Sequence, residues 1–119
     1  MSGQKGIIED KCFNFAICIV KLNAYLQDYK REYVISKQVI KSGTSIGANV
    51  SEAVNAESKT DFIHKPGIFR KECAESIFWL KLLIKSNILK ENQVLPLLND
   101  TNELLKMIRS SIMTAKKNI

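Results

Sequence analysis

The stretch Ser42-Gly-Thr-Ser-Ile-Gly-Ala-Asn-Val-Ser-Glu-Ala53 decides the fold of this chain. It lies inside a longer amphipathic pattern that predicts one continuous helix, although Gly43 and Gly47 each cost about 1 kcal/mol of helix propensity relative to alanine. Close approach of a second helix would offset this cost, because Gly43, Gly47 and Ala48 lack the bulk that holds a neighbour away. The segment therefore predicts tight helix packing, and its pattern does not resemble that of an enzyme's nucleophile, base or metal site.

The composition is that of an ordinary globular domain. The 119 residues are 45% hydrophobic and 25% charged, which predicts a single domain covering residues 1–119. Five glycines and two prolines are too few for the regularly repeated turns of a β-sandwich or barrel. We therefore predict an all-α protein, an antiparallel up-down-up-down four-helix bundle.

Four segments have the apolar periodicity of helices and are joined by short connections. They run from about Glu9 to Tyr29, Glu32 to Ala56, Thr60 to Ser86 and Asn92 to Lys117, with Asn87 as a C-terminal cap. Pro66-Gly67 interrupts the third segment. The helix either kinks there, which the helical character of residues 61–65 favours, or begins at Pro66 as its first residue.

The first predicted helix carries two apolar stripes on roughly opposite faces, each at 4-3-4 spacing. One stripe contains Phe13, Ile17, Val20 and Ala24, and the other contains Phe15, Ile19, Leu22 and Leu26. A helix packed on one side of a monomeric bundle needs only one stripe. Two stripes predict burial on two sides, inside the bundle and against another copy of the chain. We assign to helix packing or an oligomer interface Phe15, Ile19, Leu22, Leu26, Gly43, Ile46, Gly47, Ala48, Asn49 and Trp79.

The other helices have inward-facing positions of their own. The fourth follows an unbroken 4-3-4-3-4-3 seam from Val94 to Ala115. In the third, the consecutive residues 77–80 cover nearly the whole helix circumference, so either Phe78 or Leu80 is expected in the core. Trp79 belongs either to the core or to a subunit interface. The inward residues predicted for the second and third helices are Ile35, Val39, Ile46, Val50, Ala53, Phe62, Phe69, Cys73, Ile77, Leu80 and Ile84.

Catalytic arrangements are scarce in this sequence. The lone histidine, His64, has no second histidine with which to form a di-iron or zinc site. Glu52, Glu72 and Glu75 could form a carboxylate cluster for acid–base chemistry, but nearby lysines make ordinary surface ion pairs the simpler interpretation. We therefore expect no enzyme, no catalytic residue, no metal and no cofactor.

The cysteines and the apolar runs bear on location. Cys12, Cys18 and Cys73 are odd in number and match no paired CxxC spacing, so free thiols in a reducing cytoplasm are expected. The longest apolar run is far short of the ~20 residues of a membrane span. Residues 1–10 are polar and lack the apolar region of a signal peptide. We expect a cytoplasmic protein without a membrane partner.

The charge balance favours an anionic partner. The net charge is +6, and only three of the 18 cations are arginines. Lysines attract phosphate as point charges, whereas arginine forms the planar fork that reads base edges, so sequence-independent binding of RNA or DNA is predicted. A protein partner, bound through an apolar stripe of the first helix or around Trp79, is the alternative. The candidate nucleic-acid-binding residues are Lys30, Arg31, Lys37, Lys41, Lys59, Lys65, Arg70, Lys71, Lys81 and Lys85.

Several motifs together resemble a known family. They are the small-residue segment of residues 42–53, Ser58-Lys-Thr-Asp-Phe-Ile-His-Lys65 and Lys71-Glu-Cys-Ala-Glu-Ser-Ile-Phe-Trp-Leu80, with Phe13-Asn-Phe-Ala16 and Ile19-Val-Lys-Leu22 before them. The chain resembles, over nearly its whole length, the bacterial four-helix bundle family whose founding members are encoded in intervening sequences of 23S rRNA genes.

The resemblance implies a homo-oligomer, pentameric and without established enzymatic activity. A related branch, the accessory variability proteins of diversity-generating retroelements, forms a basic pentameric barrel that binds nucleic acid and a reverse transcriptase. By position, residues 43 and 45–49 would be packing residues. Two departures from the family pattern are Pro66-Gly67, which alters the third helix, and Lys41, which stands where arginine is common.

Overall fold

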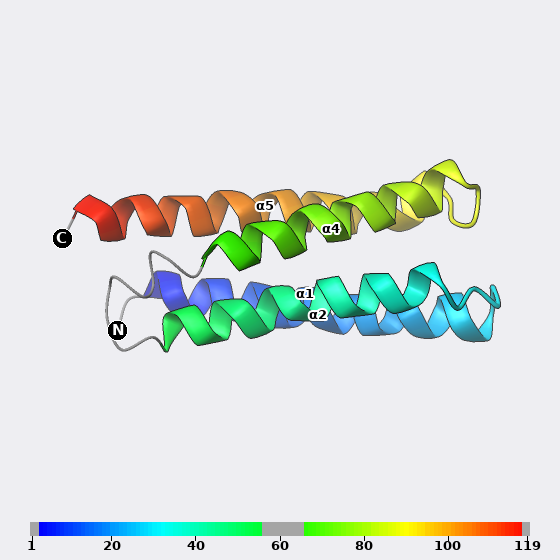
Figure 1. Ribbon diagram of the computed structural model, residues 1–119, viewed down its shortest axis with the longest axis horizontal. Helices are drawn as coiled ribbons and strands as arrows, with labels where there is room; N and C mark the ends of the chain where they lie inside the picture. Colours follow the sequence, from blue (N-terminus) through cyan, green and yellow to red (C-terminus); the bar gives the residue numbers. More distant parts are fainter. Residues whose placement is uncertain (1–2, 56–65, 118–119) are drawn as a thin grey trace.

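The computed structural model describes residues 3–55 and 66–117, and these residues form four helices without a β-strand. The helices are α1 (Gly3–Asp28), α2 (Ile35–Val54), α4 (Pro66–Lys85) and α5 (Glu91–Lys117). Figure 1 shows the chain running back and forth along one long axis, with both chain ends at one end and the α1–α2 and α4–α5 turns at the other. The predicted all-α four-helix bundle is confirmed.

The four helices are arranged as a square. α2 packs against α1 and α4, and α5 packs against α4 and α1, whereas α1 and α4 lie on a diagonal, as do α2 and α5. Every helix therefore touches its neighbours along the chain, and the contact of α5 with α1 closes the square. An ion pair supports that closure, because Lys11 Nζ lies 2.7 Å from a carboxylate oxygen of Glu103.

α1 begins six residues earlier than the predicted start at Glu9. The reason is Ile8, which extends the inner stripe by one turn and is buried in the core. Packing of Ile8 continues the helix toward Gly3, although the segment before it contains Gly3 and Gly6, which have poor helix propensity. The predicted end at Tyr29 is one residue too long.

α2 begins at Ile35 rather than at the predicted Glu32, because Glu32 is its capping residue. The Glu32 carboxylate accepts hydrogen bonds from the backbone N–H groups of Val34 (3.0 Å), Ile35 (2.9 Å) and Ser36 (2.7 Å). These donors have no partner within the helix itself. The negative charge also complements the positive end of the helix dipole.

The third predicted helix corresponds to α4, which the structure describes from Pro66 onward. The predicted start at Thr60, the kink before Pro66 and the inward position of Phe62 involve residues that lie outside the described part of the chain. The C-terminus of α4 follows the prediction. Asn87 adopts a positive φ of 62°. Its N–H donates to the Ile84 carbonyl at 3.0 Å, and the Ile88 N–H donates to the Leu83 carbonyl at 3.0 Å. This is a Schellman motif.

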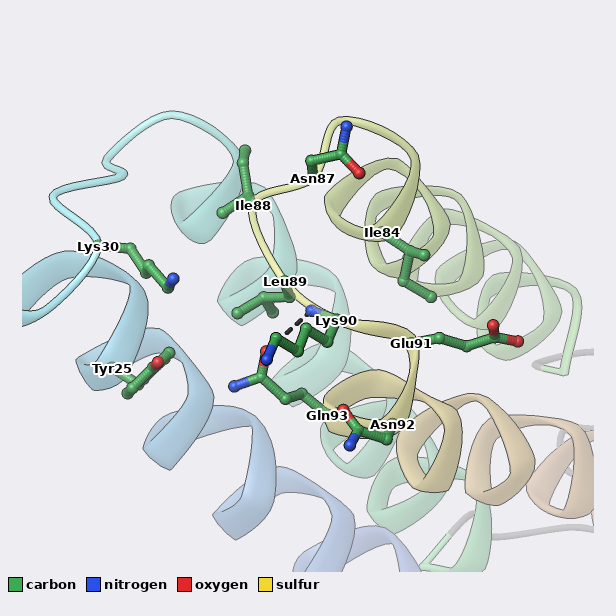
Figure 2. Close-up of a pocket in the computed structure, with 10 residues that line it drawn as sticks. All are labelled: Tyr25, Lys30, Ile84, Asn87, Ile88, Leu89, Lys90, Glu91, Asn92 and Gln93. Carbon is green, nitrogen blue, oxygen red and sulfur yellow. Dashed lines mark hydrogen bonds between the residues drawn. The ribbon is translucent and has the colours of Figure 1, made fainter.

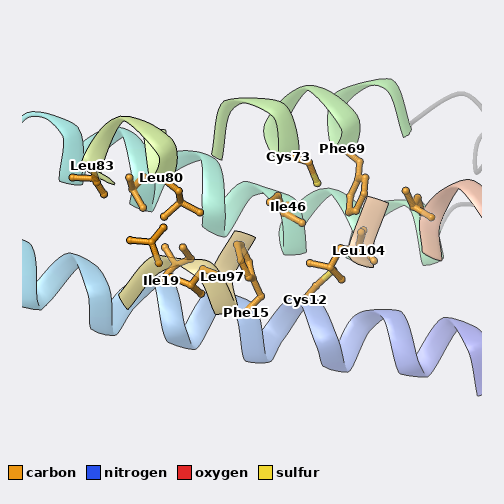
Figure 3. Packing of buried hydrophobic residues seen from close by; sticks show 14 of the residues in the cluster. Cys12, Phe15, Ile19, Ile46, Phe69, Cys73, Leu80, Leu83, Leu97 and Leu104 are labelled. Carbon is orange, nitrogen blue, oxygen red and sulfur yellow. The ribbon is translucent and has the colours of Figure 1, made fainter. Parts of the chain in front are cut away.

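The core is a single apolar cluster that runs along the axis of the bundle (Figure 3). α5 buries more residues in this core than the seam that was predicted for it. Leu97 and Leu104, which are not seam residues, are buried together with the seam residues Val94, Thr101 and Ile108. A straight α-helix drifts relative to a strict heptad, and a buried helix presents a stripe wider than a coiled-coil seam. From the other helices the main buried residues are Ile8, Cys12, Phe15, Ile19, Leu26, Val39, Ile46, Val50, Phe69, Cys73, Leu80 and Leu83.

The two glycines of the small-residue segment both face α1, but only one is in tight contact. A Cβ atom built on Gly43 would lie 2.8 Å from Ile19 Cγ1 and 2.9 Å from Ile19 Cγ2, distances that real Cβ contacts essentially never show. A Cβ on Gly47 would lie 3.6 Å from Cys12 Cβ, which is ordinary van der Waals contact. Close helix approach therefore requires glycine at position 43 and does not require it at position 47.

The hydroxyl groups of α2 are satisfied locally and across the helix interface. Ser42 Oγ donates to the Gln38 carbonyl at 3.0 Å, and Ser45 Oγ donates to the Lys41 carbonyl at 2.6 Å. Across to α4, Ser76 Oγ donates to Ser42 Oγ at 2.9 Å, and both residues are buried. The small polar residues therefore join α2 to α4 without leaving a buried hydroxyl of this pair unpaired.

Candidate functional site

The outer face of α1 is apolar and exposed. Phe13 is 69% exposed, Ile17 41% and Val20 49%. Phe15, Ile19 and Leu26 on the opposite face are buried, and Leu22 is partly buried against the core. Of the two roles predicted for the Phe15 stripe, the structure assigns helix packing within one chain. The exposed stripe of α1 is the one that begins with Phe13.

A groove of about 440 Å³ lies between α1 and α2 beside Phe13, the first residue of the exposed stripe. Most of its lining side chains are small, and the acidic residues Glu9 and Asp10 border it as well. Ala48, predicted as a packing residue, is exposed there, whereas Asn49 is half-buried and donates from Nδ2 to the Ser45 carbonyl at 2.7 Å. The groove is lined by Cys12, Phe13, Ala16, Thr44, Gly47 and Ala48, among others.

Consecutive apolar residues on α4 point in different directions. Leu80 is buried, Trp79 is half-buried against the core, and Phe78 is 58% exposed. The rings of Phe78 and Trp79 meet edge to face with centroids 4.9 Å apart. Leu80 thus takes the core position predicted for either Phe78 or Leu80. Trp79 lies at the boundary between core and surface.

The predicted cationic residues are on the surface but do not form one face. Lys59 and Lys65 lie outside the described residues. Lys37 and Lys41 extend from α2, and Arg70, Lys71, Lys81 and Lys85 extend from α4, while Lys30 and Arg31 belong to the turn between α1 and α2; all eight are exposed.

These cations are concentrated at one end of the bundle, which we call the turn end and define as residues 28–41 and 81–91. It contains both described turns (Figure 1). Seven lysines and arginines and three acids lie in these ranges, so the turn end carries +4 of the net +6. One of the acids, Glu32, is engaged in capping α2. Lys90, which lies between α4 and α5, is a turn-end cation that was not among the predicted residues.

The α1–α2 turn holds its charged residues in a fixed geometry. Lys30 N–H donates to the Tyr25 carbonyl at 3.2 Å, and Glu32 N–H donates to the Leu26 carbonyl at 2.8 Å. Between them Arg31 has a φ of 57°, a left-handed conformation that costs a non-glycine residue about 1–2 kcal/mol. The rings of Tyr25 and Tyr29 stack with centroids 5.3 Å apart, which supports the start of the turn.

A cavity of about 690 Å³ at the turn end lies between the two turns (Figure 2). Lys30 and Tyr25 border it from the α1 side. Lys90 and Gln93 border it from the start of α5, where the Lys90 N–H donates to Gln93 Oε1 at 2.8 Å. Ile84, Ile88 and Leu89 contribute apolar surface. Residues far apart in the sequence are thereby brought together, and no sequence motif marks them.

The described residues contain no group of three His, Cys, Asp or Glu side chains that could hold a metal ion. His64 lies outside the described residues. Of the proposed carboxylate cluster, Glu52 and Glu75 are exposed and Glu72 is half-buried. The absence of a catalytic site remains a prediction.

The three cysteines are free thiols in two kinds of surroundings. Cys12 and Cys73 are buried, and desolvation raises the pKa of each thiol to about 12 from the ordinary 9.0. Cys18 is exposed on α1. The two buried thiols are therefore uncharged apolar groups of the core at neutral pH.

None of the helices in the described part of the chain combines the length and the hydrophobicity that a membrane span requires.

Comparison with known proteins agrees with the geometry. A crystal structure of a protein with unknown function from the S23 ribosomal protein family of Bacteroides thetaiotaomicron VPI-5482 is similar, with a TM-score of 0.88 and 41% sequence identity over 92% of this chain and 98% of that chain. No curated protein matches the chain significantly. The family model for the 23S rRNA-intervening sequence protein matches residues 4–110. This chain therefore belongs to the 23S rRNA-intervening sequence protein family.

Proposed function

We propose that this protein is a non-enzymatic homo-oligomer that binds RNA or DNA through its lysine-rich surface, above all through the turn end. The observation that carries the proposal is the concentration of +4 of the net +6 charge in two short ranges that meet at one end of the bundle. Clustered exposed lysines attract the phosphate backbone and release its condensed counterions. Such binding has a steep salt dependence and little sequence preference.

The exposed stripe of α1 supports self-association. α1 contains three lysines and three acids, so it has no net charge, and its outer face is apolar around Phe13 and Ile17. A neighbouring copy that covers this face removes apolar surface from water at little electrostatic cost. The family resemblance implies five copies.

The square arrangement makes the two activities compatible. α4, with four cations and two acids, lies diagonally across the bundle from α1. A copy docked on the outer face of α1 is therefore on the opposite side of the bundle from Lys81 and Lys85 of α4. Repetition of the turn end around an oligomer would multiply the positive charge that nucleic acid meets. The buried free thiols Cys12 and Cys73 fit the reducing cytoplasm in which we place the protein.

The binding part of the proposal is tested by fluorescence anisotropy with an unrelated single-stranded RNA and a duplex DNA over a salt series. The variant Lys81→Gln/Lys85→Gln removes two turn-end charges, and Lys116→Gln/Lys117→Gln removes two exposed charges near the end of α5 as a matched control. We expect the first variant to make the negative slope of log K against log salt shallower by about 1.5, because two phosphate contacts are lost. The control should change this slope little. Absence of binding at low salt would remove nucleic acid from the proposal.

A protein partner is the second candidate, and the outer face of α1 is the observation that favours it. The same apolar stripe could receive a different protein instead of a second copy. Light scattering separates the two cases, because self-association predicts an oligomer of the purified chain. A monomer that captures a partner in a form resistant to nuclease and high salt would favour the scaffold function.

A further inference from the structure

We propose that the turn-end cavity binds the phosphomonoester group of a nucleotide, either at the end of a strand or in a free nucleotide. The inference deepens the nucleic-acid binding proposed above and rests on it for its biological setting. It concerns a different feature from the general basic surface, because it assigns one cavity and one chemical group.

The polar groups that border the cavity include two ammonium groups, and the remaining ones are the Tyr25 hydroxyl, the Glu91 carboxylate and the side-chain amides of Asn87, Asn92 and Gln93. Lys30 reaches it from the α1–α2 turn and Lys90 from the start of α5, and Figure 2 shows both side chains, with Tyr25 and Gln93, around the same opening. Gln93 Oε1 is occupied by the Lys90 N–H, which leaves the Nε2 donors of this amide for a ligand. The carboxylate of Glu91 extends away from the two lysines in Figure 2.

The charge of the site distinguishes a phosphomonoester from the phosphates within a strand. A phosphomonoester carries about −1.5 to −2 at neutral pH, because its second pKa is about 6. A phosphodiester within a strand carries a single negative charge. Two ammonium groups on opposite sides of one cavity, Lys30 and Lys90, therefore match the monoester better than the diester.

The apolar part of the cavity suits the remainder of a nucleotide. Ile84 and Ile88 line the cavity and are only partly buried, so their accessible parts offer apolar surface next to the donors, and the buried Leu89 supports them from the core. The volume of about 690 Å³ lies within the range of about 300–1,000 Å³ that is usual for small-ligand sites. A base or ribose can rest on this surface while its phosphate lies between the lysines.

The test compares the same short single-stranded RNA with a 5′-phosphate and with a 5′-hydroxyl, using anisotropy at moderate salt. We expect the phosphorylated strand to bind about tenfold more tightly, which is the lower range for charge-assisted hydrogen bonds. Lys90→Gln should abolish this preference, whereas Lys116→Gln should retain it. Circular dichroism establishes that both variants are folded. Unlabelled adenosine monophosphate and inorganic phosphate serve as competitors.

The outcomes separate this inference from the proposed function. Equal affinity for the two strands, with steep salt dependence, would overturn the cavity assignment and leave nucleic-acid binding intact. Binding of adenosine monophosphate in a manner abolished by Lys90→Gln, without binding of either strand, would support the cavity assignment with a free nucleotide as ligand and overturn the proposed function. Binding of no probe would overturn both.

Discussion

The inner and outer faces of α1 carry similar side chains in opposite surroundings. Phe15 and Ile19 are buried among the other three helices, whereas Phe13 and Ile17, at equivalent spacing, are exposed. Hydrophobicity and periodicity do not distinguish the two stripes. The difference lies in what faces them, because Ile19 packs against Gly43 of α2 at a distance that admits no Cβ atom.

The comparison shows that a pair of complementary surfaces, rather than an apolar stripe alone, determines which face enters the core. α2 approaches α1 closely at Gly43, where a Cβ atom has no room, and less closely at Gly47, where a Cβ atom fits. The inner face of α1 uses both positions, through Ile19 and Cys12. Among the described residues, no helix covers the outer face of α1, where Phe13, Ile17 and Val20 are exposed.

The largest effect is expected from exchanging phenylalanine for alanine on the two faces. Phe15→Ala should lower the free energy of unfolding by about 3–5 kcal/mol, because it removes a fully buried ring and leaves a cavity. Phe13→Ala should lower it by no more than about 0.5 kcal/mol, as for an exposed site, in a chain held monomeric by dilution. Urea unfolding followed by circular dichroism measures both. Equal losses would contradict the difference between the faces.

Self-association should respond in the opposite order. Phe13→Ala should raise the concentration at which the oligomer dissociates, as measured by light scattering over a dilution series, because Phe13 belongs to the exposed stripe. An oligomer that is insensitive to this substitution would exclude the outer face of α1 as its interface.

A smaller loss is expected at the tight contact between α1 and α2. Gly43→Ala should lower the free energy of unfolding by about 1–3 kcal/mol, because the new methyl group would meet Ile19 Cγ1 at 2.8 Å and force the helices apart. The double variant Gly43→Ala/Ile19→Ala should be more stable than the sum of the two single losses predicts. Additive losses would show that the methyl group does not meet Ile19.

The thiols offer a comparison that depends on pH. Burial raises the pKa of Cys12 and Cys73 to about 12, so the folded chain keeps protons that the unfolded chain releases above about 9. Their contribution to stability is therefore complete below pH 9 and is lost as the pH rises toward 12. Urea midpoints at neutral pH and near pH 10 should differ less in Cys12→Ala/Cys73→Ala than in the natural chain. An equal difference would show that these thiols titrate alike in both states.

The native thiols should also differ in reactivity. At mildly alkaline pH a thiol reagent should modify Cys18 rapidly, because this residue is exposed, and should modify Cys12 and Cys73 only after unfolding. Three rapid reactions in the folded chain would contradict the burial of Cys12 and Cys73.

The smallest effect on stability, and one of opposite sign, is expected at Gly47, where α1 and α2 are less close. Gly47→Ala should raise the free energy of unfolding by up to about 1 kcal/mol, since alanine has the better helix propensity and its Cβ would lie 3.6 Å from Cys12 Cβ. If the groove beside Gly47 receives another copy, the same substitution should weaken self-association while it stabilises the monomer. Destabilisation of the monomer would show that the helices are closer here than the distance indicates.

The fold could be predicted further than the site. The spacing of apolar residues identified all four described helices, and that of α5 placed its start within one residue of Glu91. The start of α1 was wrong because one more core contact, made by Ile8, continues the helix. The start of α2 was wrong because Glu32 lies before the helix and caps it with its side chain. Both errors occur at helix ends, where a single tertiary or capping contact outweighs periodicity.

The cationic site was predicted as a set of residues but not as a place. Lysine content alone indicated an anionic partner, and Lys30, Arg31, Lys81 and Lys85 were named from it. Lys90 was not named, and nothing in the sequence relates it to Lys30, which is 60 positions away. The antiparallel path of the helices brings the two residues to opposite sides of one cavity.

The amino-acid sequence by itself determined that the chain is helical, where most helices run, and that it has more apolar circumference than one bundle face needs. These properties depend on neighbours three or four residues apart, which local order already encodes. Only the tertiary structure decided which stripe of α1 is buried, which glycine is in tight contact with α1 and at which end of the bundle the lysines gather. Those properties depend on the distance between helices, which is set by the fit of side chains from different parts of the chain.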